Sequence, residues 1–212
     1  MYIPRHFATT QPDELQRIIQ SHPLGVLVTH GADGLDANHR PFEFDPAAGE
    51  ASVLTAQVAR ANPVWRKCAD GDAVMVVFRS LEGYVSPNWY PSKHEAHRQV
   101  PTWNYEVVHA HGRITIRDDE KFVRGVVARL TRRHEADEPQ PWKMGDSAPE
   151  YIDMMLKSIV GIEVAVTRLE GKSKLSQSCE LRDRKGVVDA LRSRWDEALA
   201  QAVEKEIGKS GG

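Results

Sequence analysis

The stretch LGVLVTHGADGLDANHRPFEF, residues 24–44, decides the fold class. Residues 24–29 form a compact apolar run with the length of a buried strand. Residues 30–34 form a turn, because glycine and aspartate favour the conformations that reverse a chain. Residues 35–44 then return, so the stretch predicts two antiparallel strands.

The rest of the chain repeats this pattern with few long connections. Further strands are predicted at residues 52–55, 73–78, 107–116 and 161–169, and helices at 10–22, 62–68, 118–133, 149–159 and from about 183. Strands and helices do not alternate as in parallel sheets, so the sequence favours a small antiparallel barrel with attached helices. We expect a mainly β fold with helices (α+β), one domain over residues 1–207, and a frayed tail at 208–212.

Composition excludes several classes of protein. The 212 residues carry a formal net charge of -2, and 41% of them are hydrophobic. This charge gives no general attraction to nucleic acid or to an anionic membrane. The longest apolar run, residues 73–78, is too short to span a bilayer, and the N-terminus lacks the apolar core of a signal peptide. We expect a cytoplasmic protein without a membrane partner.

Residues 83–105, GYVSPNWYPSKHEAHRQVPTWNY, concentrate aromatic side chains and proline. Five aromatics fall here, although aromatics make up only 7% of the chain. One interpretation is a proline-stiffened loop that closes over the core. The other is a flat surface that contacts a planar ring or a second subunit.

Two polar clusters are candidates for phosphate binding. Residues 57–63 place Arg60 beside a helix start, with Asn62 as the expected cap and free N–H groups behind it. Residues 171–178 supply two lysines, three serines and an amide just after a predicted strand. Each cluster taken alone is equally compatible with a solvated loop.

No catalytic or metal motif stands out. The sequence has no GxSxG, no HExxH and no Gly-rich phosphate loop. His109 and His111 would share one face of a strand, but no acidic or thiol partner has a useful spacing, so no metal site is predicted. His39, His109 and Tyr90 are the candidates for a general base, and each is more easily interpreted as structural; the catalytic residues stay unknown.

Five motifs in order along the chain resemble the PaiB-type family of FMN-binding negative transcriptional regulators. They are MYIP at 1–4 with HF at 6–7, ARANP at 59–63 with Trp65, YVSP at 84–87 with WY at 89–90, VPTWNY at 100–105, and GK at 171–172 with KLSQ at 174–177. The resemblance implies a split β-barrel of the FMN-binding type with peripheral helices, and a homodimer with FMN at the subunit interface. Gln57 and Ser178 depart from the family pattern, which has histidine and asparagine there.

The resemblance also implies a set of cofactor-binding residues. The candidates for binding the phosphate of FMN are Arg60, Lys172 and Lys174. The residues expected to line the isoalloxazine ring of FMN are Asn38, His39, Arg40, Pro41, Thr55, Ala56, Gln57 and Val58, and those expected to cover this ring or to seal the dimer are Trp89, Tyr90, Trp103 and Asn104. The set also includes Asn62, Ser176 and Gln177.

Three functional hypotheses remain open from the sequence. The first is an FMN-binding negative transcriptional regulator or flavin-dependent sensor, with direct DNA binding undecided. The second is a flavin-dependent oxidoreductase that acts on a small molecule, in which the flavin carries the redox chemistry. The third, prompted by Gln57 and Ser178, is a scaffold that has lost its flavin.

Overall fold

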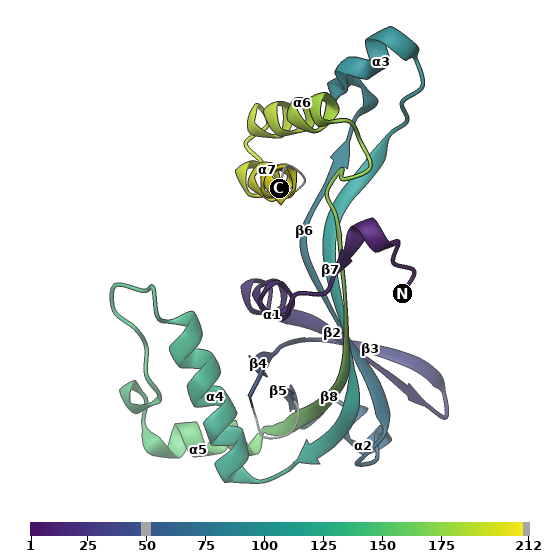
Figure 1. Ribbon diagram of the computed structural model, residues 1–212. Coiled ribbons are helices and arrows are strands. Elements are labelled where there is room, and N and C mark those ends of the chain that lie inside the picture. Colours follow the sequence, from purple (N-terminus) through teal and green to yellow (C-terminus); the bar gives the residue numbers. More distant parts are fainter. Residues whose placement is uncertain (48–51, 210–212) are drawn as a thin grey trace. The chain divides into compact units, whose positions relative to one another are not determined.

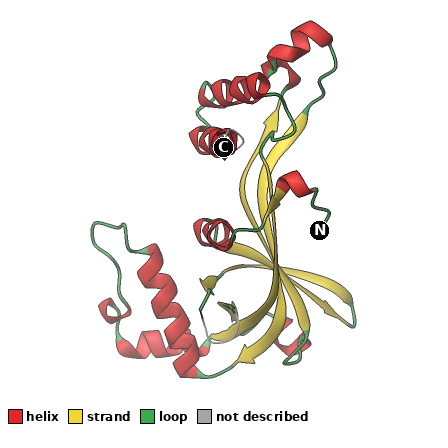
Figure 2. Cartoon of the chain, in the orientation of Figure 1, coloured by secondary structure: helices red, strands yellow, loops and turns green. Residues whose placement is uncertain are grey.

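The computed structural model describes residues 1–47 and 52–209, and within them eight strands form one sheet (Figures 1 and 2). The sheet order is β3-β2-β6-β7-β8-β5-β4, with β1 paired to β8. The strands are β1 (Ala8–Thr9), β2 (Leu24–Gly31), β3 (Gly34–Pro41), β4 (Glu43–Asp45), β5 (Val53–Ala59), β6 (Ala73–Val85), β7 (Thr102–Arg117) and β8 (Ile159–Lys174). The ladders of β2 with β3 and β6, of β4 with β5, and of β8 with β1 and β5 are antiparallel, which confirms the predicted class.

Helices account for most of the remaining residues. They are η1 (Arg5–Phe7), α1 (Pro12–Ser21), α2 (Val64–Lys67), η2 (Pro87–Trp89), α3 (Pro91–Ala96), α4 (Glu120–His134), η3 (Met144–Asp146), α5 (Pro149–Lys157), α6 (Leu181–Arg192) and α7 (Glu197–Lys209). No helix among the described residues is long and apolar enough to cross a membrane.

The chain divides into two compact units. The first unit comprises residues 1–18, 79–108 and 170–212, and the second comprises residues 19–78 and 109–169. Strands β6, β7 and β8 contribute residues to both units, because three of the four unit boundaries fall inside a strand; the fourth, between residues 18 and 19, falls inside α1. The prediction of a single domain over residues 1–207 stays a prediction.

The second unit contains the predicted hairpin of residues 24–44. Strand β2 pairs with β3 in the predicted antiparallel sense, from Leu24 opposite Pro41 to Gly31 opposite Gly34. Gly34 has a φ of 100°, a left-handed conformation that glycine adopts without steric cost. The return strand ends at Pro41, one residue before Phe42, whose side chain is buried. The chain resumes as β4, so the single predicted strand at 35–44 is two.

Helix α4 of the second unit packs through an apolar stripe. Asp119 caps the helix by accepting a hydrogen bond from the N–H of Phe122 at 2.7 Å. Val123 and Val126 on its inner face are buried, and Val123 belongs to a cluster with Ile152 and Leu156 of α5. Burial of these side chains holds the two helices together.

Two predictions for the second unit need correction. Strand β5 continues to Ala59, beyond the predicted 52–55, because Leu54, Ala56 and Val58 all face the core. Helix α2 is only four residues long and begins at Val64, one residue after Pro63, the position expected if Asn62 is the cap. The N–H of Val64 donates to Oδ1 of Asn62 at 2.9 Å, so the expected free N–H group is already used there.

In the first unit, residues 83–105 are not the predicted loop. Strand β6 runs through to Val85, and η2, α3 and the first residues of β7 take up most of the remaining stretch. Only residues 97–101 connect α3 to β7 without helix or strand. Two of the three prolines start short helices: Pro87 and Pro91 each occupy a first-turn position, where a missing N–H costs nothing, while Pro101 lies in the connection before β7.

Strand β8 is also longer than predicted. It extends from the expected end at residue 169 to Lys174, so Lys172 and Lys174 lie on the strand rather than after it. Its last part pairs with β1, with Ala8 opposite Lys172 and Thr9 opposite Gly171. Pairing with the N-terminal strand adds backbone hydrogen bonds that the local sequence of 170–174 does not reveal.

The predicted C-terminal helix from about 183 is two helices. Helix α6 ends at Arg192, and α7 begins at Glu197. Trp195 lies between them with a φ of 64° and is 95% exposed, although its spacing of four residues from Leu191 and Leu199 is typical of the apolar face of a helix. Gly208 and Lys209, predicted as frayed, belong to α7, and residues 210–212 lie outside the described residues.

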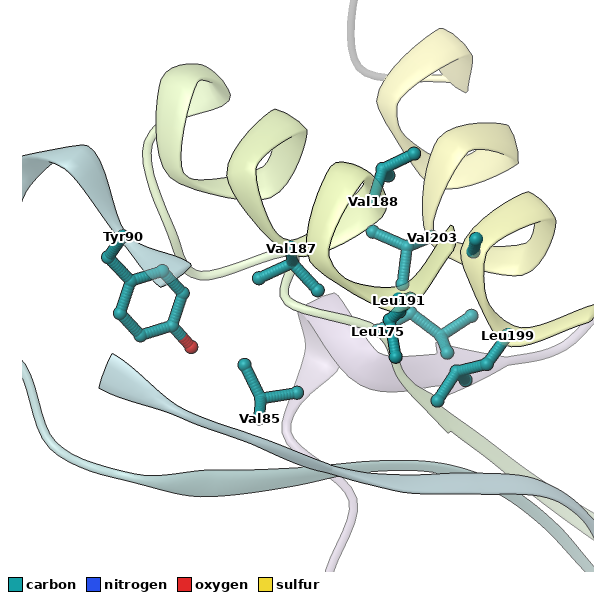
Figure 3. Close-up of a cluster of buried hydrophobic side chains, with 9 residues drawn as sticks. Val85, Tyr90, Leu175, Val187, Val188, Leu191, Leu199 and Val203 are labelled. Atoms are coloured by element: carbon teal, nitrogen blue, oxygen red, sulfur yellow. The ribbon is translucent and has the colours of Figure 1, made fainter. Parts of the chain in front are cut away.

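Helices α6 and α7 share one apolar cluster with side chains from residues 85–90 and with Leu175, which directly follows β8 (Figure 3). Its buried members are Val85, Tyr90, Leu175, Val187, Val188, Leu191, Leu199, Ala200 and Val203. Asp183 is a residue type that often caps a helix, but it lies inside α6 and is fully buried. Its carboxylate accepts from the N–H and Oγ of Ser92 at 3.0 and 2.6 Å, which ties α6 to α3.

Candidate functional site

Eight of the predicted cofactor residues lie on two strands of the second unit. Asn38, His39, Arg40 and Pro41 end β3, while Thr55, Ala56, Gln57 and Val58 occupy the middle of β5. Asn38 is tied to the turn before α2, because its Oδ1 accepts from Nδ2 of Asn62 at 2.7 Å. The structure thus brings Asn38 and Asn62 together as a hydrogen-bonded pair.

The two ring-lining segments, residues 38–41 and 55–58, contain polar side-chain atoms without a hydrogen-bond partner. Among the described residues, three buried side-chain nitrogen or oxygen atoms have no hydrogen-bond partner: Nε of Arg40, Oε1 of Gln57 and Nε of Arg117. Two of the three belong to predicted cofactor residues, one as a donor and one as an acceptor. A buried polar atom without a partner is costly, so such atoms mark places where a ligand group can bind.

Other members of these segments face the protein. Ala56 and Val58 are fully buried in the core, and Thr55 donates its Oγ1 hydrogen to Oε2 of Glu43 at 3.3 Å. His39 is exposed, and Pro41 is half-buried. Of the predicted β5 residues, Gln57 is therefore the one whose polar side chain is not already satisfied.

Arg60 is bound to another part of the second unit. Its guanidinium donates to both carboxylate oxygens of Asp118, at 2.9 and 2.5 Å, and its Nε donates to the carbonyl of Lys157 at 2.7 Å. The hydrogen bonds from Arg60 hold the pKa of the Asp118 carboxyl below its usual value. Arg60 would have to exchange Asp118 for a phosphate to act as predicted.

The predicted residues of the first unit form a second group around the end of β8. Asn104 is fully buried, and its Nδ2 donates to Oγ of Ser176 at 2.9 Å. Ser176 has a φ of 65°, and Gln177 holds the same turn through the N–H of Leu175 at 2.6 Å and the carbonyl of Ser173 at 2.7 Å. These bonds fix the shape of the turn after Lys174.

The two lysines of β8 have local partners. The ammonium of Lys172 lies 3.3 Å from the carbonyl oxygen of Tyr2 and 5.3 Å from the ring centre of Tyr105. Lys174 donates to Oγ1 of Thr102 at the start of β7. Both lysines are only half-buried, so each keeps access for an anion.

The aromatic residues divide into buried and exposed ones. Tyr90 is buried in the cluster of Figure 3, and burial raises the pKa of its phenol above the ordinary value. Trp89 is half-buried, with the guanidinium of Arg194 at 4.7 Å from its ring centre. Trp103 is 54% exposed and contacts the ring of Tyr84 edge-on at 6.2 Å. Trp103 is the predicted aromatic whose ring is free to meet a ligand or a subunit.

Sequence comparison identifies the family. The family model described as "Putative FMN-binding domain" matches residues 1–168. The chain belongs to this family. "Protease synthase and sporulation protein PAI 2" of Bacillus subtilis is 28% identical over 212 residues, covering 99% of each chain. An uncharacterized protein of Emericella nidulans is 30% identical and covers 93% of each chain. The resemblance to the PaiB-type family is therefore confirmed, and FMN is its cofactor.

Solved structures support the same fold at low identity. A conserved hypothetical protein from Mycobacterium tuberculosis superposes with a TM-score of 0.58 at 12% identity, covering 85% of this chain and 94% of its own. The flavocytochrome Anf3 from Azotobacter vinelandii gives 0.57 at 11% identity, covering 81% and 72%. These similarities confirm the predicted split-barrel fold of the FMN-binding family.

The residues present fit the family's cofactor. The edge of the isoalloxazine ring carries carbonyl acceptors and an N–H donor, which are the complements of a buried donor such as Arg40 Nε and a buried acceptor such as Gln57 Oε1. Gln57 is thus compatible with a flavin even though it replaces the expected histidine. Ser178 is exposed, and the structure gives it no role.

Sequence reasoning missed the groups that hold the candidates in place. The sequence pattern predicts Asp118 only as part of a helix start, yet it binds Arg60 from 58 residues away. Tyr2 is a family-motif residue, but no pattern predicts that its carbonyl is a partner of Lys172 across 170 residues. Neither pairing can be recognised from a local sequence pattern, because both depend on how distant parts of the chain align.

Proposed function

We propose that this PaiB-type protein binds FMN as a homodimer in the cytoplasm and acts as a flavin-dependent sensor that lowers gene expression. The observation that carries the proposal is the pair of orphaned polar atoms on the ring-lining segments, Nε of Arg40 and Oε1 of Gln57. Bound FMN would supply a reversible two-electron redox centre. Arg40 and Gln57 would orient the ring, and Arg60 of the same unit would be a candidate for the phosphate.

A sensor fits the charge distribution better than a direct DNA-binding protein. Helix α6 carries a cluster of basic residues, but Arg182 pairs with Glu95 and Glu180, and Arg192 pairs with Glu197 and Glu204. Paired arginines release few counterions on binding to DNA and so contribute little affinity. The name of the Bacillus subtilis relative, "Protease synthase and sporulation protein PAI 2", links it to sporulation, which supports a regulatory role.

A homodimer is supported by the aromatic surface of the first unit. Tyr84 and Trp103 are large, adjacent and exposed, and Val100 nearby in sequence is also exposed. Aromatic side chains of this kind are enriched at subunit contacts relative to the rest of the surface. Two-fold dimers are the commonest assemblies of soluble proteins.

The deciding experiment is an absorption spectrum of the purified protein before and after incubation with FMN and desalting. Flavin bands that survive desalting, at one FMN per chain, support the proposal; their absence in both samples refutes it and favours the scaffold without flavin. Anaerobic bleaching of bound flavin by a nicotinamide cofactor, with turnover of a small substrate, would favour the oxidoreductase instead.

A further inference from the structure

A separate cavity lies wholly within the first unit. It encloses about 450 Å³, a volume typical of small-molecule sites. Its wall is made by the N-terminal segment with α1, by single residues of β6 and β7, by the end of β8, and by one face of α7. The polar and charged wall residues include Thr9, Glu14, Arg17, Glu106, Ser173 and Lys205.

A buried carboxylate lies in this cavity wall. Glu106 is only 3% exposed, and its Oε1 accepts from Nη2 of Arg17 at 2.6 Å. Its Oε2 accepts from Oγ of Ser80 at 3.2 Å. A carboxylate is rarely buried to this extent unless it is paired or has a functional role, because desolvation strongly disfavours its charged form.

The charges in the wall alternate along a chain of ion pairs. Arg17 bridges Glu106 to Glu14, whose Oε2 lies 2.9 Å from Nε of Arg17. Glu14 in turn pairs with Lys205 of α7. Lys205 and Arg17 hold the pKa of the Glu14 carboxyl at about 2, so the group is ionised at neutral pH. The four charges sum to zero, and so do those of Glu206 and Lys209, which form an ion pair in the same wall.

The cavity shares Ser173, Leu175 and Gln177 with the predicted phosphate segment 171–178, but no residue with the segments predicted to line the flavin ring. Within the described part of the chain, Gln177 is the only predicted cofactor residue in its wall, and both ends of that carboxamide are used within its own turn. The helix that closes the cavity, α7, lies beyond residue 168, where the match to the FMN-binding family model ends. The cavity is therefore formed jointly by residues within that match, from the N-terminal segment, α1, β6 and β7, and by residues beyond it.

The charges of the cavity wall indicate which class of ligand it can bind, because they alternate in sign and sum to zero. A ligand with a net charge would leave one charge uncompensated in a partly buried site, which is costly. A zwitterion can place its cationic nitrogen against Glu106 or Glu14 and its anionic group against Arg17 or Lys205. We propose that this cavity binds a small zwitterion of amino-acid or dipeptide size.

Two hydroxyl groups in the same wall suit such a ligand. Oγ1 of Thr9 and Oγ of Ser173 lie 2.8 Å apart. Each hydroxyl can both donate and accept a hydrogen bond, so the pair can satisfy further polar atoms of an amino acid or a peptide bond.

The test is calorimetry on the full chain loaded with FMN. The probes are the L-α-amino acids and glycyl dipeptides at millimolar concentration, each compared with its decarboxylated amine and its deaminated acid. We expect at least one zwitterion to bind once per chain, and its amine and acid to bind at least tenfold more weakly. Glycerol serves as the uncharged comparison and should not bind.

Two variants connect binding to the cavity. Ala198→Trp introduces a bulky ring at an exposed wall position of α7 and should abolish binding, whereas Lys185→Trp, on the exposed part of α6 and outside the wall, should not. Glu106→Gln should weaken binding at least tenfold; if it fails to fold, the Trp variants decide. Binding by no zwitterion, equal binding of the amine or acid, binding of glycerol, or a zwitterion bound normally by Ala198→Trp would each overturn the proposal.

Discussion

Replacing Gln57 with methionine should change the stability and the flavin affinity of this protein in opposite directions. The Oε1 atom of Gln57 is buried without a hydrogen-bond partner, and methionine has a similar length without the polar atoms. Removing a buried, unsatisfied carbonyl relieves a desolvation cost of about 1–3 kcal/mol. We therefore expect Gln57→Met to raise the free energy of unfolding of the FMN-free protein.

The same change should weaken FMN binding. A hydrogen bond between neutral groups contributes about 0.5–1.5 kcal/mol, which corresponds to a roughly two- to tenfold increase in Kd. The Kd is measured by quenching of FMN fluorescence, and stability by urea denaturation of the FMN-free chain. Gln140→Met, at an exposed position of the same unit, is the matched control and should change neither quantity.

The two measurements together can refute the reasoning. A Gln57→Met protein that loses stability without FMN would mean that Oε1 has a stabilising partner after all. An unchanged Kd for FMN with increased stability would mean that Gln57 does not bind the flavin. The buried Oε1 atom would still be unsatisfied, as the structure shows. Only a gain in stability combined with a loss of affinity supports a role of this side chain in holding the ring.

Three further predictions concern other groups. Arg60→Ala should weaken FMN binding by about 1.5–3 kcal/mol if the guanidinium binds the phosphate. Asp118→Asn should then strengthen FMN binding, because it frees Arg60 from its ion pair. A fluorescence titration in which both variants keep the original Kd would contradict phosphate binding by Arg60. The pKa of Glu14 is lowered from 4.5 to about 2, so its contribution to stability is present above pH 4.5 and is lost as pH falls toward 2. In Glu14→Gln, the melting temperature should therefore depend less on pH between 4.5 and 2 than in the unaltered chain. Plots of melting temperature against pH that run parallel for the two proteins would disprove this contribution. Trp103→Ala should lower both the stability of the proposed dimer and its flavin affinity; sedimentation that shows a monomer for the unaltered chain at tens of micromolar, with or without FMN, would rule out the dimer.

The strands were more predictable from the sequence than their ends. The β2–β3 hairpin was predictable because an apolar run, a turn rich in glycine and a return strand are adjacent in the chain. The extensions of β6 to Val85 and of β8 to Lys174 were not, because most of the residues that extend them are polar or aromatic. Their strand conformation depends on distant partners, as the pairing of Lys172 with Ala8 shows.

The break between α6 and α7 was missed for a similar reason. Val187, Leu191, Leu199 and Val203 keep a helical spacing across the break, so the periodicity alone predicts one continuous helix. The actual turn places Trp195 in a left-handed conformation that tryptophan rarely adopts.

The candidate site was predictable only in part. The family motifs named the candidate residues, because they stand in the same order along the chain as in the family. The unsatisfied atoms of Arg40 and Gln57 could be found only from side-chain packing, since burial depends on residues far away in the sequence.

The division of the chain into interleaved segments affects the order in which the two units can fold during protein synthesis. Residues 19–169 contain every segment of the second unit, whereas the first unit also needs the last segment, residues 170–212. A ribosome therefore delivers all of the second unit before it has delivered α6 and α7. Until these helices emerge, the apolar side chains of Val85 and Tyr90 have no cover, so a nascent chain paused near residue 169 should be a preferred substrate for chaperones.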